Sequence, residues 1–89
     1  MRKFEISDKL KKDLAKFSKK DKNRYDSTIK KIKEIISCED VNHYKNLRKP
    51  LQHLKRVHIN TSFVLTFEFI ESEDVIKFVE LEHHDKVYK

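Results

Sequence analysis

The chain has 89 residues, of which 40% are charged and 37% apolar, and its formal net charge is +6. A chain of this length buries a small core, and its apolar fraction is too high for an intrinsically disordered protein. Glycine is absent, which excludes glycine-rich phosphate-binding loops and the G-x-S-x-G turn of serine hydrolases. We therefore expect one folded domain over residues 1–89.

The basic residues are concentrated in the first two thirds of the chain. Residues 1–37 carry 13 basic and 6 acidic groups, residues 38–60 carry 5 and 2, and residues 61–89 carry 3 and 7. Such an excess favours a polyanion as partner, and RNA or DNA is the default. The alternative is a set of solvated lysines that only keep the protein soluble.

Nothing in the sequence indicates export or a membrane. No signal peptide, transmembrane run or lipidation motif is visible, so we expect a cytoplasmic protein with no membrane partner. The one cysteine, Cys38, has no second cysteine with which to form an internal disulfide. It is most simply a packed or loop thiol.

The first half predicts a strand and two helices. Residues 3–6 alternate, with Phe4 and Ile6 inward. Ser7 is a suitable N-cap for a helix that ends near residues 18–20, and Asp21 caps a second helix that ends near residues 37–40. Both helices carry apolar residues at helical spacing and form an antiparallel pair that can cover one face of a sheet. These residues are Leu10, Leu14, Phe17, Tyr25, Ile29, Ile32, Ile35 and Ile36.

The second half predicts three strands. Apolar runs rich in Val, Ile, Phe and Thr cover residues 57–59, 63–70 and 75–81, and an acidic turn separates the last two. Pro50 is expected to mark entry into the first of these strands. The predicted order is β-α-α-β-β-β, an α+β fold with two helices on a twisted antiparallel sheet. In the run of residues 63–70, one face of the strand is expected to carry Phe63, Leu65, Phe67 and Phe69.

The histidines are the candidates for chemistry. His58 lies in a strand beside Arg56, and one of His83 and His84 must face the same side as this basic rim. Imidazoles can take and give protons near neutral pH, which suits acid–base work on a phosphodiester. The simpler interpretation is that these histidines pack and hydrogen-bond.

Other kinds of site are less well supported by the sequence. No H-x-x-x-H or C-x-x-C spacing exists, so we expect no metal site and no cofactor. His43, Tyr44 and His53 lie in a basic connection, where they could stack on bases or simply pack within the loop.

Three strings, in this order and spacing, resemble the RelE superfamily of bacterial and archaeal toxins. They are LRKPLQHLKRVHI at residues 47–59, SFVLTFEF at 62–69 and VELEHHDKVYK at 79–89. Within the superfamily they are most similar to the YafQ branch, in which a histidine–isoleucine pair opens a hairpin and a histidine precedes an aromatic by four residues. His58-Ile59 and His84 with Tyr88 match that pattern.

The resemblance implies the RelE-like fold and a type II toxin that is a metal-independent endoribonuclease, an mRNA interferase acting on the ribosome. Its mechanism is attack of a ribose 2′-hydroxyl on the adjacent phosphate. It implies as partners a cognate antitoxin, mRNA and the ribosome, with operator DNA bound only through the toxin–antitoxin complex. The residues implied for catalysis are His58, His84, Tyr88 and Lys49, and those for substrate binding are Arg56, Lys55, His53 and Arg48.

Two departures keep other functions open. The carboxylate expected four residues after the hairpin histidine is Ser62, which leaves Asp85 as a substitute, and the arginine of the RelE Y-R-L-V-Y string is Val64. The alternatives are a ParE-like inhibitor of gyrase, which shares the fold without the catalytic set, and a catalytically weak RNA- or ribosome-binding relative.

Overall fold

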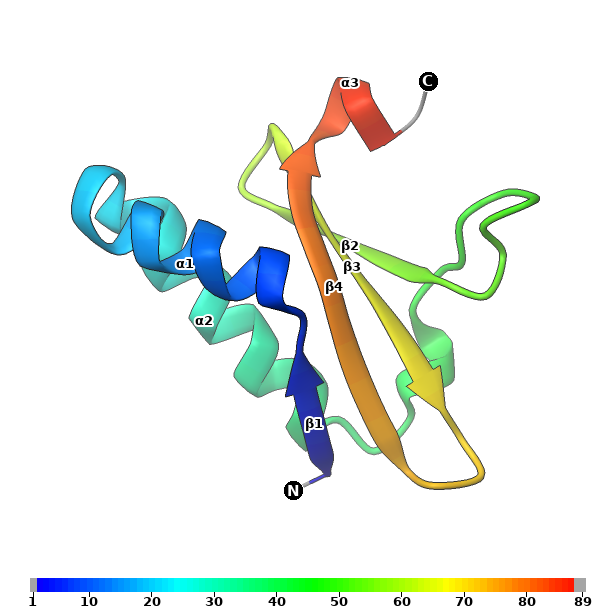
Figure 1. Cartoon of the computed structure of the whole chain (residues 1–89). Helices are drawn as coiled ribbons and strands as arrows, with labels where there is room; N and C mark the ends of the chain where they lie inside the picture. Colours follow the sequence, from blue (N-terminus) through cyan, green and yellow to red (C-terminus); the bar gives the residue numbers. More distant parts are fainter. Residues whose placement is uncertain (1, 88–89) are drawn as a thin grey trace.

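Four strands form one sheet, and two helices cover one of its faces (Figure 1). The computed structural model describes residues 2–87, and the order of the strands across the sheet is β1-β4-β3-β2. No helix among these residues is long and apolar enough to cross a membrane. The elements are β1 (Lys3–Ile6), α1 (Asp8–Lys20), α2 (Lys22–Ser37), the 3₁₀ turn η1 (Val41–His43), β2 (Lys55–Ile59), β3 (Phe63–Ile70), β4 (Val75–His83) and α3 (His84–Val87).

The predicted α+β class is confirmed, with one difference within the sheet. Strands β2, β3 and β4 are antiparallel, as short turns between them require, but β1 runs parallel to β4. No tight turn joins β1 to β4, because the α1–α2 pair and two strands lie between them in the chain. The sheet is therefore mixed rather than wholly antiparallel.

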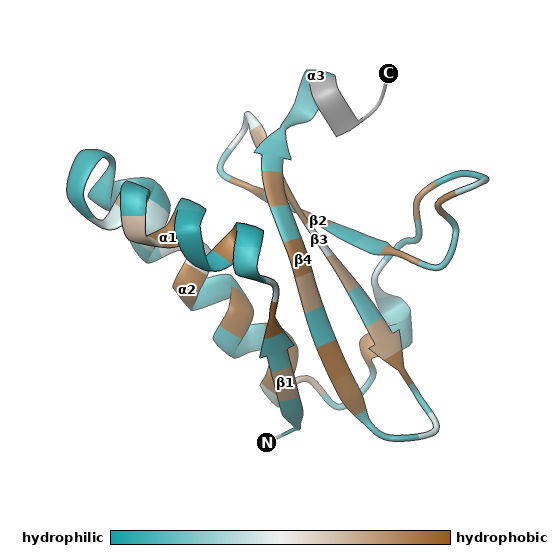
Figure 2. Ribbon diagram, in the orientation of Figure 1, coloured by the Kyte–Doolittle hydropathy of each residue, from teal (hydrophilic) through white to brown (hydrophobic). Residues whose placement is uncertain are grey.

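The helix boundaries follow the predicted caps. The Ser7 hydroxyl oxygen accepts from the Leu10 N–H at 3.1 Å, and the Asp21 carboxylate accepts from the Arg24 N–H at 3.1 Å. Apolar and polar positions are interspersed along both helices and along β4, whereas β3 is mostly apolar (Figure 2). Residues of the two helices, η1 and strands β2, β3 and β4 form the core, which is Leu10, Leu14, Ile32, Ile35, Ile36, Val41, Ile59, Leu65, Phe67, Ile76, Phe78 and Leu81.

One local prediction was met only in part, and another was wrong. Phe4 lies on the core side of β1, opposite Ile76 and edge-to-face with Phe78 at 6.2 Å, but it is 44% exposed because β1 is an edge strand. Pro50 does not mark strand entry, since β2 begins five residues later at Lys55. A pair of turns lies between them, in which the N–H of Leu51 donates to the carbonyl of Arg48 and that of Leu54 donates to the carbonyl of Leu51.

A β-bulge interrupts the pairing of β3 with β4. Phe67 pairs with Phe78 and Thr66 with Glu80, so Val79 is an extra residue without a partner in register. The Ser7 hydroxyl, the N-cap of α1, donates to the Val79 carbonyl. An extra residue reverses the alternation of side chains beyond it. The bulge therefore lets β4 place Phe78 and then Leu81 in the core.

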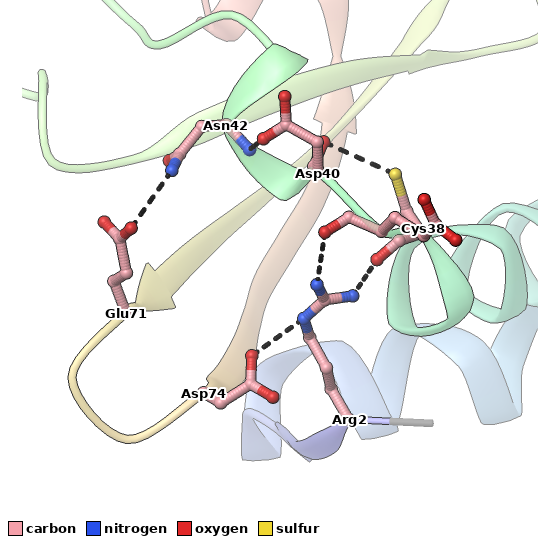
Figure 3. A network of polar contacts seen from close by, with 7 residues as sticks. Arg2, Cys38, Asp40, Asn42, Glu71 and Asp74 are labelled. Atoms are coloured by element: carbon pink, nitrogen blue, oxygen red, sulfur yellow. Dashed lines mark hydrogen bonds and ion pairs between the residues drawn. The ribbon is translucent and has the colours of Figure 1, made fainter.

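Arg2 joins three parts of the chain at the end of the molecule opposite α3 (Figure 3). Its Nε lies 2.8 Å from Asp74 in the β3–β4 turn, and its other nitrogens donate to the carbonyls of Cys38 and Glu39 after α2. The guanidinium supplies donors to carbonyls that follow the helix, so it fixes the start of β1 against both segments.

We expect Ser7→Ala to lower the free energy of unfolding by about 1–2 kcal/mol, because it removes the N-cap of α1 together with the bond to the bulge. The measurement is chemical denaturation followed by circular dichroism. Ser18→Ala is the control, since this exposed hydroxyl bonds only to the Ala15 carbonyl within its own helix. Equal losses in the two variants would show that the link to Val79 contributes nothing.

Candidate functional site

The face of the sheet that α1 and α2 leave uncovered, called here the open face, carries two rows of side chains. In one row His58 of β2, Val64 of β3 and Glu82 of β4 lie side by side. Val64 is fully buried between its longer neighbours. The second row has the same form, with the buried Thr66 at its centre, and consists of Arg56, Thr66 and Glu80.

His58 and His84 meet at the end of the first row. Their ring centroids are 5.6 Å apart and the rings are inclined by 29°. His84 is the first residue of α3, and its N–H donates to the carbonyl of Ser62 at 2.7 Å. Ser62 lies in the turn that follows His58, and Asn60 in the same turn has a left-handed φ of 57°. The backbone thus holds the two imidazoles together although they are far apart in the sequence.

A lysine of α1 pairs with the carboxylates of the open face. Lys9 Nζ lies 2.5 Å from Glu82 and 3.3 Å from Glu80. The hydrogen bond to Glu82, more than any other cause, raises the pKa of the Lys9 ammonium. Sequence reasoning did not find this group, because Lys9 and Glu82 are 73 residues apart and the bulge that exposes both glutamates has no sequence signature.

Asp85, which the sequence analysis named as a substitute carboxylate, lies beside both His83 and His84. Its two oxygens are 3.7 Å from His83 Nδ1 and 3.8 Å from His84 Nδ1. His83 itself contacts Phe63 edge-to-face at 5.4 Å, from which it follows that His84 is the member of the pair that joins His58. The sequence had left this choice open.

The other predicted residues are more scattered. Arg48, Lys49 and His53 are exposed in the loop before β2, at the opposite end of that strand from His58 (Figure 1). The structure therefore does not bring them to the histidine pair. Tyr88 lies outside the described residues.

Lys55 differs from the other predicted residues because it is buried. Only 6% of its surface is exposed, and Nζ donates to the Tyr44 carbonyl at 3.3 Å and to Asn46 Oδ1 at 3.2 Å. It pairs with Phe67, on the side of the sheet that faces the core. Its position indicates that it fastens the connection before β2.

Among the described residues no group of three possible metal ligands is gathered.

Two archaeal proteins are similar to the whole chain. One, named "Putative toxin RelE4", is from Methanocaldococcus jannaschii and is 46% identical over all 89 residues, which match 93% of its length. The second, an uncharacterized protein of Methanosarcina mazei, is 38% identical over 96% of both chains. No family model matches the sequence.

Solved toxin structures share the fold at low sequence identity. A YoeB/ParE toxin from Agrobacterium tumefaciens superposes with a TM-score of 0.78 at 10% identity, over 92% of this chain and 98% of its own. A YoeB–YefM complex from Staphylococcus aureus gives 0.74 at 17% identity, over 94% and 98%. YafQ from Escherichia coli gives 0.69 at 14% identity, over the full length of both chains.

The identity to the Methanocaldococcus protein, together with the shared fold, establishes the family. The chain belongs to the RelE/ParE superfamily of toxins, as the three sequence strings had predicted.

We expect Lys55→Met to lower the free energy of unfolding by about 1–3 kcal/mol, because it removes the buried ammonium that donates to the Tyr44 carbonyl and to Asn46 Oδ1. Lys45→Met, an exposed lysine in the same connection, should change it by less than about 0.5 kcal/mol. Denaturant titration of both variants makes the comparison. A Lys55→Met protein of normal stability that no longer binds RNA would instead favour the role in substrate binding.

Proposed function

We propose that this protein is the toxin of a type II toxin–antitoxin pair and that it cuts mRNA on the ribosome. The observation that carries the proposal is the pair of imidazoles, 5.6 Å apart on the open face and supplied by the end of β2 and the start of α3. Family membership supports the proposal but does not decide it, because the same fold serves proteins with different activities.

The pair suits cleavage by an internal hydroxyl. One neutral imidazole takes the proton of the ribose 2′-hydroxyl, whose oxygen attacks the adjacent phosphorus. The bond from phosphorus to the 5′-oxygen breaks, and the second, protonated imidazole gives that oxygen a proton. The products are a 2′,3′-cyclic phosphate and a 5′-hydroxyl. No metal enters these steps.

The surroundings of the pair support the handling of a phosphate. Arg56 lies on the same face as His58, two residues earlier in β2, and can hold the phosphate oxygens through a guanidinium fork. Lys9 offsets the two carboxylates of β4 that would otherwise repel an anion. Lys49, Arg48 and His53 are proposed to contact the strand further along, and Tyr88 to position a base or the leaving group.

A substrate held by the ribosome fits this exposed arrangement. His58 is exposed and His84 half-buried, so the protein alone provides little to fix a flexible RNA in position. Holding a strand in a reactive geometry is a large part of catalysis, and the ribosome can do this for mRNA in its A site. We therefore expect cuts only in mRNA that is being translated, in the cytoplasm.

A cognate antitoxin is the proposed protein partner. The Staphylococcus aureus relative was solved in complex with YefM, and this chain carries a net charge of +6 that an acidic partner would offset. Such a partner would cover the open face and the helices. Any binding to operator DNA would take place through the complex.

In a cell-free translation system, the wild-type protein should produce cuts within the reading frame. His58→Ala and His84→Ala should each reduce the cutting rate by about 100-fold or more, because each removes a proton-transfer group. Mapping the 5′ ends of the fragments by primer extension measures this. A single 2′-deoxynucleotide at the mapped position should abolish that cut, since the nucleophile is then missing.

His43→Ala is the matched control. This histidine is exposed and its ring packs on Tyr44, away from the pair, so its removal should leave the cuts unchanged. Normal translation with uncut mRNA in the presence of wild-type protein would contradict the proposal. The next assay would then be supercoiling by gyrase, for the ParE-like alternative.

The cutting rate should show a bell-shaped dependence on pH. One imidazole must be neutral and the other protonated, so activity falls at low pH, where both are protonated, and at high pH, where both are neutral. Single-turnover rates on stalled ribosome complexes measure the profile. In the residual activity of each alanine variant one limb should be missing, and the limb that disappears identifies the base or the acid. A flat profile would exclude histidine acid–base catalysis.

A further inference from the structure

A second polar site lies on the helical side of His58. A depression of about 270 Å³ opens between α2 and the end of β2. This depression is open to solvent and has room for a phosphate group. It is lined by Ser27, Lys30, Lys31, Glu34, His58, Ile59 and Asn60.

The polar groups around the depression match an anion that accepts hydrogen bonds. Lys30 and Lys31 supply two ammonium groups, and Ser27 and Asn60 can donate from a hydroxyl and an amide. Glu34 is the opposing charge. Lys31 lies 2.8 Å from it, and this hydrogen bond lowers the pKa of the Glu34 carboxyl. An anion that enters the depression can therefore bind two ammonium groups, although the Lys31 ammonium is also paired with Glu34.

His58 connects this depression to the histidine pair. The same residue lines the depression and stacks on His84, so a strand that crosses the end of β2 touches both places. We propose that the depression binds the phosphate of the nucleotide next to the cut, with Lys30 and Lys31 as its main ligands. This inference rests on the proposed function, because it assigns a second point of binding to the same RNA.

An RNA strand is favoured over an acidic protein segment by the position of the depression. A strand cut at the His58–His84 pair must continue past one side of His58. Its next phosphate lies one nucleotide away from the scissile phosphate. The depression begins at the residue that would handle the scissile phosphate. Its ligands are also few and close together, as suits one phosphate rather than an extended acidic surface.

The test is the salt dependence of binding to an RNA that cannot be cut. A labelled single-stranded RNA of roughly twelve nucleotides, with 2′-O-methyl ribose throughout, is titrated with protein between about 50 and 200 mM salt, and fluorescence anisotropy reports binding. Removing one lysine that neutralises a phosphate lowers the slope of log K against log salt by about 0.7. The Lys30→Gln, Lys31→Gln double variant should therefore lower it by roughly 0.7–1.4.

The matched control is the Lys22→Gln, Lys33→Gln double variant, which changes the same charge on the same helix at two exposed lysines outside the depression. It should keep the wild-type slope. Glu34→Gln should tighten binding, because it removes the opposing charge and releases Lys31. Combining His58→Ala with the Lys30, Lys31 variant should weaken binding non-additively, since both act on one strand.

Several results would overturn the inference. One is an unchanged slope in the Lys30, Lys31 variant, and another is an equal change in the control, which would indicate diffuse attraction only. Binding of inorganic phosphate that is lost in the Lys30, Lys31 variant, together with an unchanged RNA slope, would assign the depression to the free ion. If the Lys30, Lys31 variant loses affinity for a poly-glutamate peptide but not for RNA, the depression would be assigned to an acidic protein segment.

The proposed nuclease function is decided separately, by the cuts that the wild-type protein makes in translated mRNA. Because the RNA in the binding assay has no free 2′-hydroxyl, its result does not depend on catalysis. In the translation assay, the Lys30→Gln, Lys31→Gln variant should need more protein for half-maximal cutting and retain the maximal rate. A lower maximal rate with unchanged binding would contradict the assignment.

Discussion

The extra residue at Val79 determines which side chains of β4 lie in the core and which lie on the open face. Before it, β4 turns Ile76 and Phe78 into the core, and simple alternation would send Glu80 and Glu82 after them. The bulge reverses the alternation, so Leu81 enters the core and both glutamates reach the open face. The start of α1 contacts this part of β4 in two ways. Ser7 donates to the Val79 carbonyl, and Lys9 pairs with both glutamates.

The backbone brings the two members of the histidine pair together. Strand register brings His58 level with Glu82 across β3, and the bond from the His84 N–H to Ser62 begins α3 directly beside the hairpin turn. On the open face, the buried residues Val64 and Thr66 lie between the longer side chains. The polar groups are therefore supported by packed residues of β3. An arrangement built in this way is preorganised even though His58 is exposed and His84 is only half-buried.

Local signals predicted most of the fold. The caps at Ser7 and Asp21 and the apolar spacing of both helices indicated boundaries that the structure confirms, because each depends on residues a few positions apart. The parallel pairing of β1, the exposure of Phe4 and the late start of β2 depend on contacts between distant segments. For the site, the sequence identified His58 and His84 as candidates because of their residue type. It could not show that the two rings meet, that Lys9 pairs with the glutamates or that Lys55 is buried, because these depend on how distant segments pack together.

The pairing of β1 with β4 has a consequence for the order in which the protein can form during synthesis. The first strand finds its neighbour only in residues 75–78, and Arg2 finds Asp74 at a separation of 72 residues. A growing chain therefore keeps β1 without its strand partner until the last strand leaves the ribosome, and long-range pairing of this kind is slow. His84 emerges with that same strand. The histidine pair therefore forms only after β4 has been made, as late in synthesis as the pairing of β1.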